Sequence, residues 1–481
     1  MNNLTKTLIH EMARRTNTTV TPDHLAVLDY AYAHYGAHRV GPLYQNLARH
    51  TGYRRADVER LFPSGLLSVY TWVGIPIHKP DGRCKPMAKI DVEDRRDVYL
   101  DHNATTYVRE EIRRLLADRH QADCFGNPSS SSDLGRSAHD EVSAARAGIA
   151  GCLGVAGHEI VFTGCGSEAN NLAIKGTALR QIGRGGHIIT SATEHSAVLE
   201  PVQYLAELGF EVTVLGVESD GRVSPTAVAH ALRPSTTLVA IMAVNNEIGV
   251  VNPISEIGAV CRQAAVPFFV DAIQGFGKTE LRPKENGITM LSLSGHKIYA
   301  PKGVGALYVD DEHELLPLVH GGGQEYGRRA GTENVDAIVA FAEAARLAHA
   351  ERAQEHERML GLRAYFLQRL FEIEPAAVVN GSLEHRAANN LNIGFPHIDS
   401  GSLLLSLNQI GIAVSAGSAC HAGGVEASHV LRALGADTDR YGSLRFSFGL
   451  RTTAADLDYL FRYLGEILST LRGEGGPRAL H

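Results

Sequence analysis

Four short polar segments, each at the end of an apolar run, carry side chains that together could do chemistry. Residues 164–168 (GCGSE) open a helical pattern, His195 and Asp271 each follow an apolar run, and residues 296–297 (HK) follow another. A glycine-rich turn at a helix N-terminus offers N–H groups to a phosphate, a carboxylate can pair with a cationic ring nitrogen, and a lysine amine can form an imine. Each signal is weak alone. Their joint occurrence in chain order predicts a pyridoxal phosphate site.

Apolar, β-branched runs alternate with helical patterns from Tyr99 onward. They cover residues 160–164, 187–195, 211–217, 237–244, 267–272, 290–297 and 304–309. Continuous apolar strands separated by helices indicate a mainly parallel sheet with helices on both faces. Ligands of such sheets bind beyond the carboxyl ends of the strands, where the polar segments lie. The sequence therefore predicts an α/β fold with a large doubly wound domain.

The rest of the chain is organised differently on the two sides of that domain. An amphipathic helix begins at Thr21-Pro22 and ends near Gly36, and two shorter helical patterns follow it. A long helix is expected over about residues 330–370, and a last helix begins at a Thr453-x-x-Asp456 cap. We expect a helical N-terminal domain, a linker, the large domain and a small α+β domain, at residues 1–84, 85–98, 99–345 and 346–481.

Composition excludes several classes of function. The 481 residues are 44% hydrophobic and 21% charged, as in ordinary globular proteins, and 46 Lys+Arg against 53 Asp+Glu give a net charge of −7. This charge does not favour nucleic acid or anionic membranes as partners. Residues 1–92 carry a net charge of +5 and the remainder −12, which suggests a basic module joined to an acidic one. There is no membrane-length apolar run and no signal-peptide pattern at the start, so we expect a cytoplasmic protein.

The six cysteines are spaced too irregularly for a disulfide framework, and no CxxC pair suggests structural zinc, so no metal is expected. In a reducing compartment a special cysteine is more often reactive than structural. Cys124, Cys152 and Cys261 have no chemical partner in the sequence and are interpreted as structural. Cys165 lies next to the glycine-rich turn, but the chemistry requires no role for it.

Ten segments between residues 97 and 471 match the motifs of one enzyme family, in the same order. They include YLDHNATT (99–106), VFTGCGSEANNLAIKG (161–176), VDAIQGFGK (270–278), SLSGHKIYAPKGVGALYV (292–309) and GGGQEYGRRAGTEN (321–334). The chain resembles the cysteine desulfurases of the NifS/IscS type, which are class V aminotransferase-like enzymes. The SAGSAC segment and the insertion after it resemble this group and not the SufS-like group. The resemblance implies an aspartate aminotransferase-like fold, pyridoxal phosphate (PLP) as cofactor and a homodimer.

The resemblance also implies roles around the cofactor, residue by residue. Lys297 would be the Schiff-base lysine, and Asp271 would keep the pyridinium nitrogen protonated. His195 would stack on the ring and move protons. The remaining residues would hold the ring's O3′ (Asn246 and Gln274) or its phosphate (Gly166, Ser167, Ser294, His296 and, from the neighbouring subunit, Thr332).

Two further residues would act on the substrate, L-cysteine. Arg445 would bind its carboxylate in a bidentate fork, with Asn246 beside it. Cys420 would attack the substrate sulfur as a thiolate, so that alanine leaves and Cys420 carries a persulfide. His195 or the adjacent His421 would help to deprotonate Cys420. The residues after Cys420 depart from the family's commoner Thr-Ser, which leaves the preferred acceptor open.

The N-terminal region carries shorter motifs of its own. TPDH (21–24), LFPSG (61–65) and the arm GIPIHKPDGRC (74–84) are similar to the TusE/DsrC family of sulfur-relay proteins. In that family a helical domain ends in an arm whose cysteine takes up sulfur, so the resemblance implies a relay role for Cys84. Here the arm is longer, and a linker follows Cys84 instead of a chain end. The alternative is that Cys84 is an incidental linker residue.

The resulting hypothesis is a desulfurase fused to its own sulfur carrier, which hands sulfur to acceptor or carrier proteins. Two alternatives stay open: a selenocysteine lyase, which uses the same lysine and arginine scaffold, and a non-catalytic scaffold for sulfur-transfer partners. The presence of Asp271, Lys297, His195, Arg445 and Cys420 together argues against a scaffold. The final product could be an iron–sulfur cluster, a thionucleoside or another thio-compound.

Overall fold

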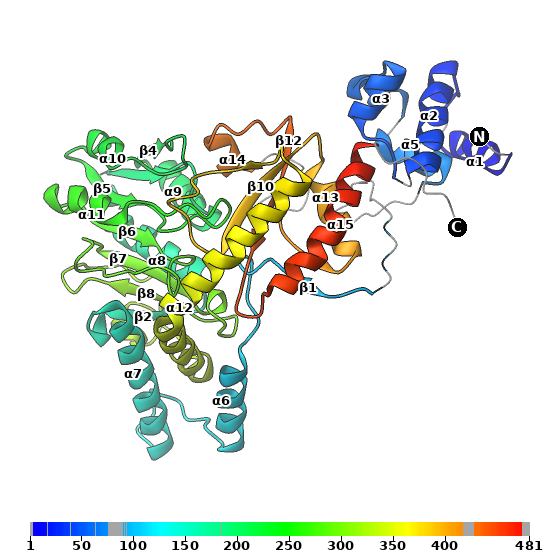
Figure 1. Cartoon of the computed structure of the whole chain (residues 1–481). Coiled ribbons are helices and arrows are strands. Elements are labelled where there is room, and N and C mark those ends of the chain that lie inside the picture. The colour runs from blue at the N-terminus through cyan, green and yellow to red at the C-terminus, as the bar shows by residue number, and fades with distance from the viewer. Residues whose placement is uncertain are drawn as a thin grey trace.

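The computed structural model describes residues 3–16, 18–38, 40–62, 64–75, 90, 92, 94–183, 185–416 and 428–473. Along the chain it shows a group of N-terminal helices, a large sheet covered by helices, and a smaller sheet with its own helices (Figure 1). Cys84, Cys420 and His421 lie outside the described residues.

In the described part of the N-terminal module there are five helices, and Trp72, Tyr70 and Phe62 are fully buried at its centre. His24 joins this core, because its ring bonds to the Thr21 hydroxyl (2.7 Å) and to the Leu61 carbonyl (2.8 Å). The expected helix after Thr21 is confirmed. The helices are α1 (Asn3–Arg15), α2 (Pro22–His38), α3 (Tyr44–Thr51), α4 (Arg55–Leu61) and α5 (Leu66–Val73).

The module contacts the C-terminal part of the chain (Figure 1). Val40 is 2% exposed and belongs to the apolar core around the smaller sheet, together with Ile90. A Cβ on Gly473, the residue that caps the last helix, would meet the His34 ring at 2.9 Å. The module is therefore packed against the end of that helix.

The large sheet has seven strands in the order β2-β8-β7-β6-β5-β3-β4. Neighbours from β7 to β4 are parallel, whereas β8 runs antiparallel to both β2 and β7. The predicted mainly parallel, doubly wound sheet is thus confirmed, with one reversed strand. The strands are β2 (Ile160–Thr163), β3 (His187–Ser191), β4 (Glu211–Leu215), β5 (Thr236–Ala240), β6 (Phe268–Asp271), β7 (Met290–Ser294) and β8 (Gly305–Val309).

Helices cover both faces of this sheet, as Figure 1 shows. The helices that precede or connect the strands are α6 (Glu110–Gln121), α7 (Asp133–Leu153), α8 (Gly166–Ala178), α9 (Ser196–Glu207), α10 (Pro225–Ala231) and α11 (Ile254–Gln263). Short 3₁₀ turns are η1 (Gly157–Glu159), η2 (Leu179–Gln181), η3 (Gly295–Lys297) and η4 (Gln324–Gly327). The apolar run at 187–195 is longer than its strand, because the chain turns after Ser191 to begin α9.

One helix, α12 (Val335–Ile373), connects the two sheet regions, and its 39 residues span about 58 Å. Its first half, including Phe341, packs in the core of the large sheet, and its second half, including Phe366, packs in the core of the smaller sheet. This long helix was predicted from the sequence and is confirmed.

The smaller sheet has the order β12-β10-β9, and a separate two-stranded pair joins β1 to β11. Segment 98–101 lies between β11 and β12, since Leu100 N donates to Ala413 O and Ser447 N donates to Leu100 O. The last helix has the predicted Thr453–Asp456 capping box. These elements are β1 (Val98–Tyr99), β9 (Val378–Val379), β10 (Asn390–Pro396), α13 (Ser400–Gln409), β11 (Ile412–Ala413), α14 (His429–Ala433), β12 (Tyr441–Ser447) and α15 (Ala454–Arg472). Among the described residues, no helix is both long and apolar enough to span a bilayer.

Candidate active site

Lys297 ends the 3₁₀ turn η3, directly after β7. Its Nζ donates to the carbonyls of Asn103 and Ala104, both at 2.7 Å. The turn is fixed from the same segment, because Thr106 N and Oγ1 both donate to the His296 carbonyl. Residues 103–106, which follow β1, thus position the amine of Lys297.

Asp271 ends β6, and both of its carboxylate oxygens have donors. Ile273 N donates to Oδ1 (3.0 Å), and Asn170 Nδ2 donates to Oδ2 (2.7 Å). Burial raises the pKa of Asp271, while the Ile273 N–H, His195 and Asn170 oppose that shift. A cationic ring nitrogen beside this carboxylate would favour its ionised form.

The glycine-rich turn forms the N-terminus of α8. Cys165 is the N-cap, its Sγ accepting from Glu168 N, and Ser167 is exposed in the first turn. A Cβ on Gly166 would lie 2.3 Å from Ile273 Cδ1 and 3.3 Å from Ser294 Cβ. Glycine is therefore needed for this close packing, which brings the helix N-terminus beside Ser294 and the Asp271 turn.

His195 is the N-cap of α9, and its Nδ1 accepts from Ala197 N (3.0 Å). This bond favours the neutral tautomer with the proton on Nε2. Desolvation lowers the pKa of His195, although Asp271 opposes the shift. The pKa of His296 falls to about 4 because of burial and the nearby charge of Lys297. Both imidazoles are therefore neutral at pH 7.

The two lysines of the site have unusually low pKa values. Burial, followed by the charge of Arg445, lowers the pKa of Lys297 to about 8. Burial and the charges of Lys297 and Arg445 lower the pKa of Lys278 to about 7. Lys278 donates to Gln274 Oε1 (2.8 Å), and Gln274 Nε2 donates to Asn103 O (2.8 Å). Such shifts are typical of functional sites, because they leave an amine partly neutral and nucleophilic near pH 7.

Uptake of PLP by the cofactor-free protein should consequently depend on pH. The neutral Lys297 amine is the form that attacks an aldehyde, so the rate should rise about tenfold per pH unit at low pH and level off above about pH 8. Stopped-flow absorbance of the forming chromophore measures this rate. Arg445→Gln should move the midpoint upward, because a nearby positive charge is removed. A midpoint near 10.5, the ordinary lysine value, would contradict the expected environment of Lys297.

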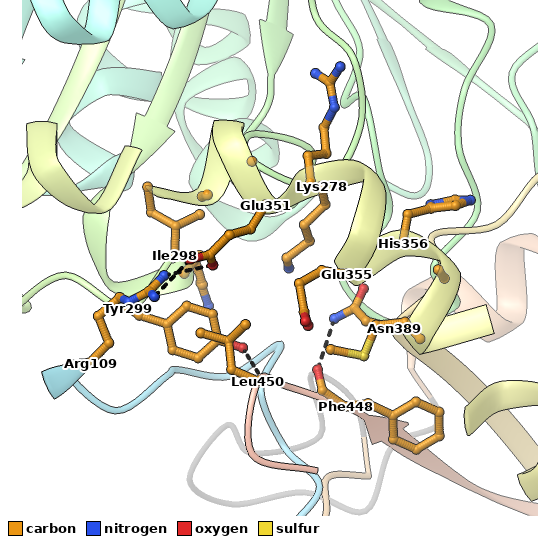
Figure 2. Close-up of a pocket in the computed structure, with 16 residues that line it drawn as sticks. Arg109, Lys278, Ile298, Tyr299, Glu351, Glu355, His356, Asn389, Phe448 and Leu450 are labelled. Carbon is orange, nitrogen blue, oxygen red and sulfur yellow. Dashed lines mark hydrogen bonds and ion pairs between the residues drawn. The ribbon is translucent and has the colours of Figure 1, made fainter. Parts of the chain in front are cut away.

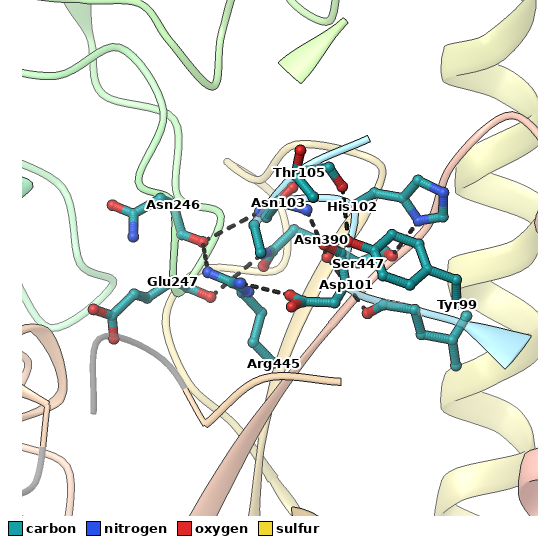
Figure 3. A network of polar contacts seen from close by, with 12 residues as sticks. Tyr99, Asp101, His102, Asn103, Thr105, Asn246, Glu247, Asn390, Arg445 and Ser447 are labelled. Atoms are coloured by element: carbon teal, nitrogen blue, oxygen red, sulfur yellow. Dashed lines mark hydrogen bonds and ion pairs between the residues drawn. The ribbon is translucent and has the colours of Figure 1, made fainter. Parts of the chain in front are cut away.

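Arg445 on β12 is the cationic group on the other side of the site. Its Nη1 donates to the main-chain carbonyl of Asn246 (2.9 Å), and its Nη2 forms a 2.6 Å ion pair with Asp101. Figure 3 shows the guanidinium between these two groups, with the Asn246 side chain directed away. The predicted Arg445–Asn246 proximity is thus present, but through the main chain of Asn246.

The segment that contains Cys420 begins and ends at this site. Before it, Ser415 exchanges both main-chain hydrogen bonds with Arg445. After it, Ser428 Oγ donates to Glu247 (2.5 Å), and the His429 ring bonds to the carbonyl of Glu194, the residue before His195. Cys420 itself is five residues after Ser415 in the sequence and lies outside the described residues.

A pocket that is partly open to solvent borders the site between α12 and the β7–η3 turn. Figure 2 shows Lys278 extending into it, with Glu355 and Asn389 nearby. Lys297 also lines this pocket, whereas Asp271, His195 and Gly166 do not. The pocket therefore lies beside the group of residues predicted to hold the cofactor, and shares Lys297 with it.

The cysteines differ in their surroundings. Cys261 is buried, which raises its pKa to about 12, and partial burial raises the pKa of Cys152. Neither is suited to act as a thiolate, in agreement with the structural interpretation. Cys124 is exposed, so its interpretation as a structural residue is not supported by burial. Cys165 is exposed at the start of α8.

The described residues fit PLP. A helix N-terminus with Ser167, Ser294 and His296 offers a place for a phosphate, Asp271 for a ring nitrogen, and Lys297 for an aldehyde carbon. Asn170 Oδ1 and Arg445 Nε, both buried, have no hydrogen-bond partner among the described residues. Thr332 is exposed, and its predicted role toward a neighbouring subunit stays a prediction. The motif search missed Asp101, Asn103, Asn170 and Lys278, although all four lie within or next to matching segments.

The comparisons with known proteins agree with this site. The class-V aminotransferase family matches residues 98–460. Cysteine desulfurase IscS of Dictyoglomus turgidum is 42% identical over 379 residues, which are 79% of this chain and 96% of the relative. A solved NifS-like protein is 34% identical with a TM-score of 0.74, covering 78% of this chain and all of the other.

A second solved structure, titled SspA in complex with cysteine, is 37% identical with a TM-score of 0.65 and covers 73% of this chain and 98% of its own. Each of these matches covers most of the other protein and leaves about a fifth to a quarter of this chain uncovered. The chain therefore belongs to the class-V aminotransferase family and, within it, to the PLP-dependent cysteine desulfurases of the IscS and NifS type.

Proposed function

We propose that this cysteine desulfurase takes sulfur from free L-cysteine onto Cys420 and passes it on through Cys84 of its N-terminal module. The observation that carries the first step is where the described residues on either side of Cys420 lie. Before it, Ser415 pairs with the main chain of Arg445. After it, Ser428 bonds to Glu247, and the His429 ring bonds to the carbonyl of the residue before His195. A solved relative, SspA, is described in complex with cysteine, which supports the same substrate here.

Each residue has a part in this reaction. Bound PLP supplies an aldehyde for the substrate amine and a ring that withdraws electrons from the α-carbon. Lys297 holds the cofactor and then takes the α-proton, for which its lowered pKa is suited. Asp271 keeps the ring nitrogen protonated, and Arg445 binds the substrate carboxylate. The Cys420 thiolate then attacks the substrate sulfur, so that an S–S bond forms as the C–S bond breaks. The electron pair of the broken bond goes to the β-carbon, which takes up a proton, and the products are alanine and a Cys420 persulfide.

The second step assigns the N-terminal module as a sulfur carrier of the TusE/DsrC type. Support comes from its sequence motifs, its net charge of +5 against −12 for the rest, and its packing through Val40 and Ile90. Cys84 precedes Ile90 by six residues in the sequence, so the chain tethers its thiol to the same protein. Tethering raises the effective concentration of the carrier thiol to about the millimolar range.

We further propose a homodimer with shared active sites. Large apolar side chains are exposed within residues 98–460, which match the class-V aminotransferase family: Phe125 (75%), Tyr326 (61%) and Leu134 (52%). Exposed aromatic groups are more typical of an interface than of free surface. Thr332, also exposed, would reach the phosphate site of the second subunit. Acceptor proteins beyond Cys84 would complete the pathway, in the reducing cytoplasm that the sequence predicts.

Mass spectrometry of the holoenzyme after incubation with L-cysteine tests both steps. We expect alanine in solution and added sulfur on the peptides containing Cys420 and Cys84. Cys84→Ser should keep the Cys420 persulfide and lose sulfur from the N-terminal module. Cys124→Ser, which removes an exposed thiol in the large domain, should keep both.

Three other outcomes are informative. Turnover with selenocysteine alone would favour the lyase alternative, and absence of alanine would favour the scaffold. Sulfur on Cys420 but never on Cys84, even with carrier proteins added, would refute the relay.

A further inference from the structure

The guanidinium of Arg445 already has a carboxylate partner from its own chain. Arg445 Nη2 lies 2.6 Å from Asp101 Oδ1, and the two side chains are 6% and 18% exposed. Of the five N–H donors of Arg445, one goes to Asp101 and one to the Asn246 carbonyl, and Nε is buried without an acceptor among the described residues. Among the described residues, the guanidinium of Arg445 thus has only some of its donors paired, and its Nε can donate to a further acceptor.

The sheet fixes Asp101 beside Arg445. Asp101 forms a parallel bridge with Ser447, which lies two residues after Arg445 and therefore on the same face of β12. The Asp101 carbonyl also accepts from Ala104 N and from the Tyr99 hydroxyl. The same Arg445 main chain binds Ser415, from which the Cys420 segment leaves. The Asp101–Arg445 ion pair therefore belongs to the network of polar contacts that Figure 3 shows, and the strands hold both of its residues in place.

An incoming amino acid meets this guanidinium after Asp101 has neutralised it. A second carboxylate at Arg445 would lie about 5 Å from the Asp101 carboxylate, where like-charge repulsion at an effective dielectric constant of about 20 changes a binding constant by more than tenfold. Arg445 Nε and one Nη can together donate to the substrate carboxylate in a bidentate contact. This contact requires Asp101 to give up its hydrogen bond with Arg445 Nη2.

We propose that Asp101 is the resident counter-ion of Arg445, which the substrate carboxylate displaces, and that Asp101 thereby sets the affinity of the site for amino-acid carboxylates. The inference rests on the proposed role of Arg445 as the carboxylate-binding residue. In the substrate-free protein, Asp101 keeps the buried cation paired and in place, since an unpaired buried charge is costly. When substrate binds, its carboxylate replaces that of Asp101. The affinity of the site for anions is therefore lower than it would be if Arg445 had no counter-ion.

Asp101 also acts on the neighbouring lysine. Its negative charge raises the pKa of Lys297 and so opposes the effect of Arg445. The charge of Arg445 acts on two neighbouring lysines, Lys297 and Lys278, whose pKa values it lowers. The charge of Asp271, like that of Asp101, raises the pKa of Lys297. Displacement of Asp101 from Arg445 thus changes the balance of charge at the reacting amine at the time of substrate binding.

The test is equilibrium binding of L-alanine to the holoenzyme, followed by the absorbance of the cofactor. L-alanine carries the amine and carboxylate of the substrate but no sulfur. Asp101→Asn keeps an oxygen acceptor for Arg445 and removes the charge, so its dissociation constant for L-alanine should fall about tenfold. L-alaninamide, which lacks the carboxylate, should bind wild type and Asp101→Asn within about twofold of each other.

Further variants separate this inference from the proposed function. Arg445→Gln should weaken L-alanine binding by about a hundredfold, and adding Asp101→Asn to it should give no tightening. Asp101→Glu, which retains the charge, should not tighten binding, and Asp101→Ser provides a second neutral variant. Unchanged or weaker L-alanine binding in both neutral variants would overturn the role of Asp101. No loss of binding in Arg445→Gln would instead overturn the assignment of Arg445.

Discussion

Lys297→Ala is expected to yield a folded, colourless protein with no measurable release of alanine from cysteine. The side chain is the amine at the end of η3 that is held toward the site by two carbonyls, and its lowered pKa makes it nucleophilic near neutral pH. Its loss removes both the covalent attachment of the cofactor and the base for the α-proton. General-base catalysis alone contributes up to about 10⁴-fold, or about 5 kcal/mol of transition-state stabilisation, so activity should fall by at least that factor.

Lys278→Met is the matched control for this substitution. Lys278 is also buried, has an even lower pKa, and lies in the same network through Gln274. If Lys297 is the attachment point, Lys278→Met should still form the yellow holoenzyme, and a tryptic peptide reduced with borohydride should carry the cofactor at Lys297. Retention of a reducible cofactor bond in Lys297→Ala would contradict this assignment and implicate Lys278.

The sequence allowed prediction of the residues that follow strands. Asp271 and Lys297 lie at the ends of adjacent parallel strands, β6 and β7, whose carboxyl ends must share one edge of the sheet. The glycine-rich turn lies next to them because α8 begins directly after β2, with Gly166 packed on Ser294. For these residues, chain order and the sheet rule are sufficient, and no tertiary detail is needed.

Contacts between distant segments could not be predicted in the same way. Asp101 is separated from Arg445 by 344 residues, and Lys297 from its Asn103 partner by 194. Neither periodicity nor strand position indicates that segment 98–101 inserts between β11 and β12. Asp101 was therefore part of a matching motif without an assigned partner, and its charge at the substrate site became apparent only with the fold.

The burial of individual polar side chains also could not be predicted from the sequence. A lysine in a sequence is normally interpreted as a solvated charge, yet Lys278 is enclosed and has a pKa of about 7. Asn246 was expected beside the cofactor ring and the substrate carboxylate, and its contact with Arg445 is made by its main-chain carbonyl. Every residue has a main-chain carbonyl whatever its type, so contacts made by these groups cannot be predicted from the sequence and are seen only in the folded structure.

Cys420→Ser should abolish desulfuration while preserving the first stages of the reaction. In the proposed mechanism, substrate binding depends on Arg445, and cofactor binding depends on Lys297 and Asp271. This substitution alters none of them. A serine hydroxyl is protonated at neutral pH and does not attack the substrate sulfur as a thiolate does. Alanine release should therefore fall by about 10³-fold or more, equivalent to about 4 kcal/mol. L-alanine should still bind with nearly the wild-type dissociation constant.

Cys165→Ser is the matched control for this prediction, because Cys165 is the other cysteine next to the site and is exposed at the N-cap of α8. Serine is a good N-cap residue, so this variant should retain the cofactor and form the persulfide on Cys420. The decisive measurement is the amount of alanine formed in a single turnover, together with the location of the added sulfur. If Cys420→Ser still forms stoichiometric alanine and Cys165→Ser does not, the attacking thiol is at the start of α8. In that case the main-chain bridge between Ser415 and Arg445 would position Arg445 for substrate binding, and the segment after Ser415 would have no part in sulfur transfer.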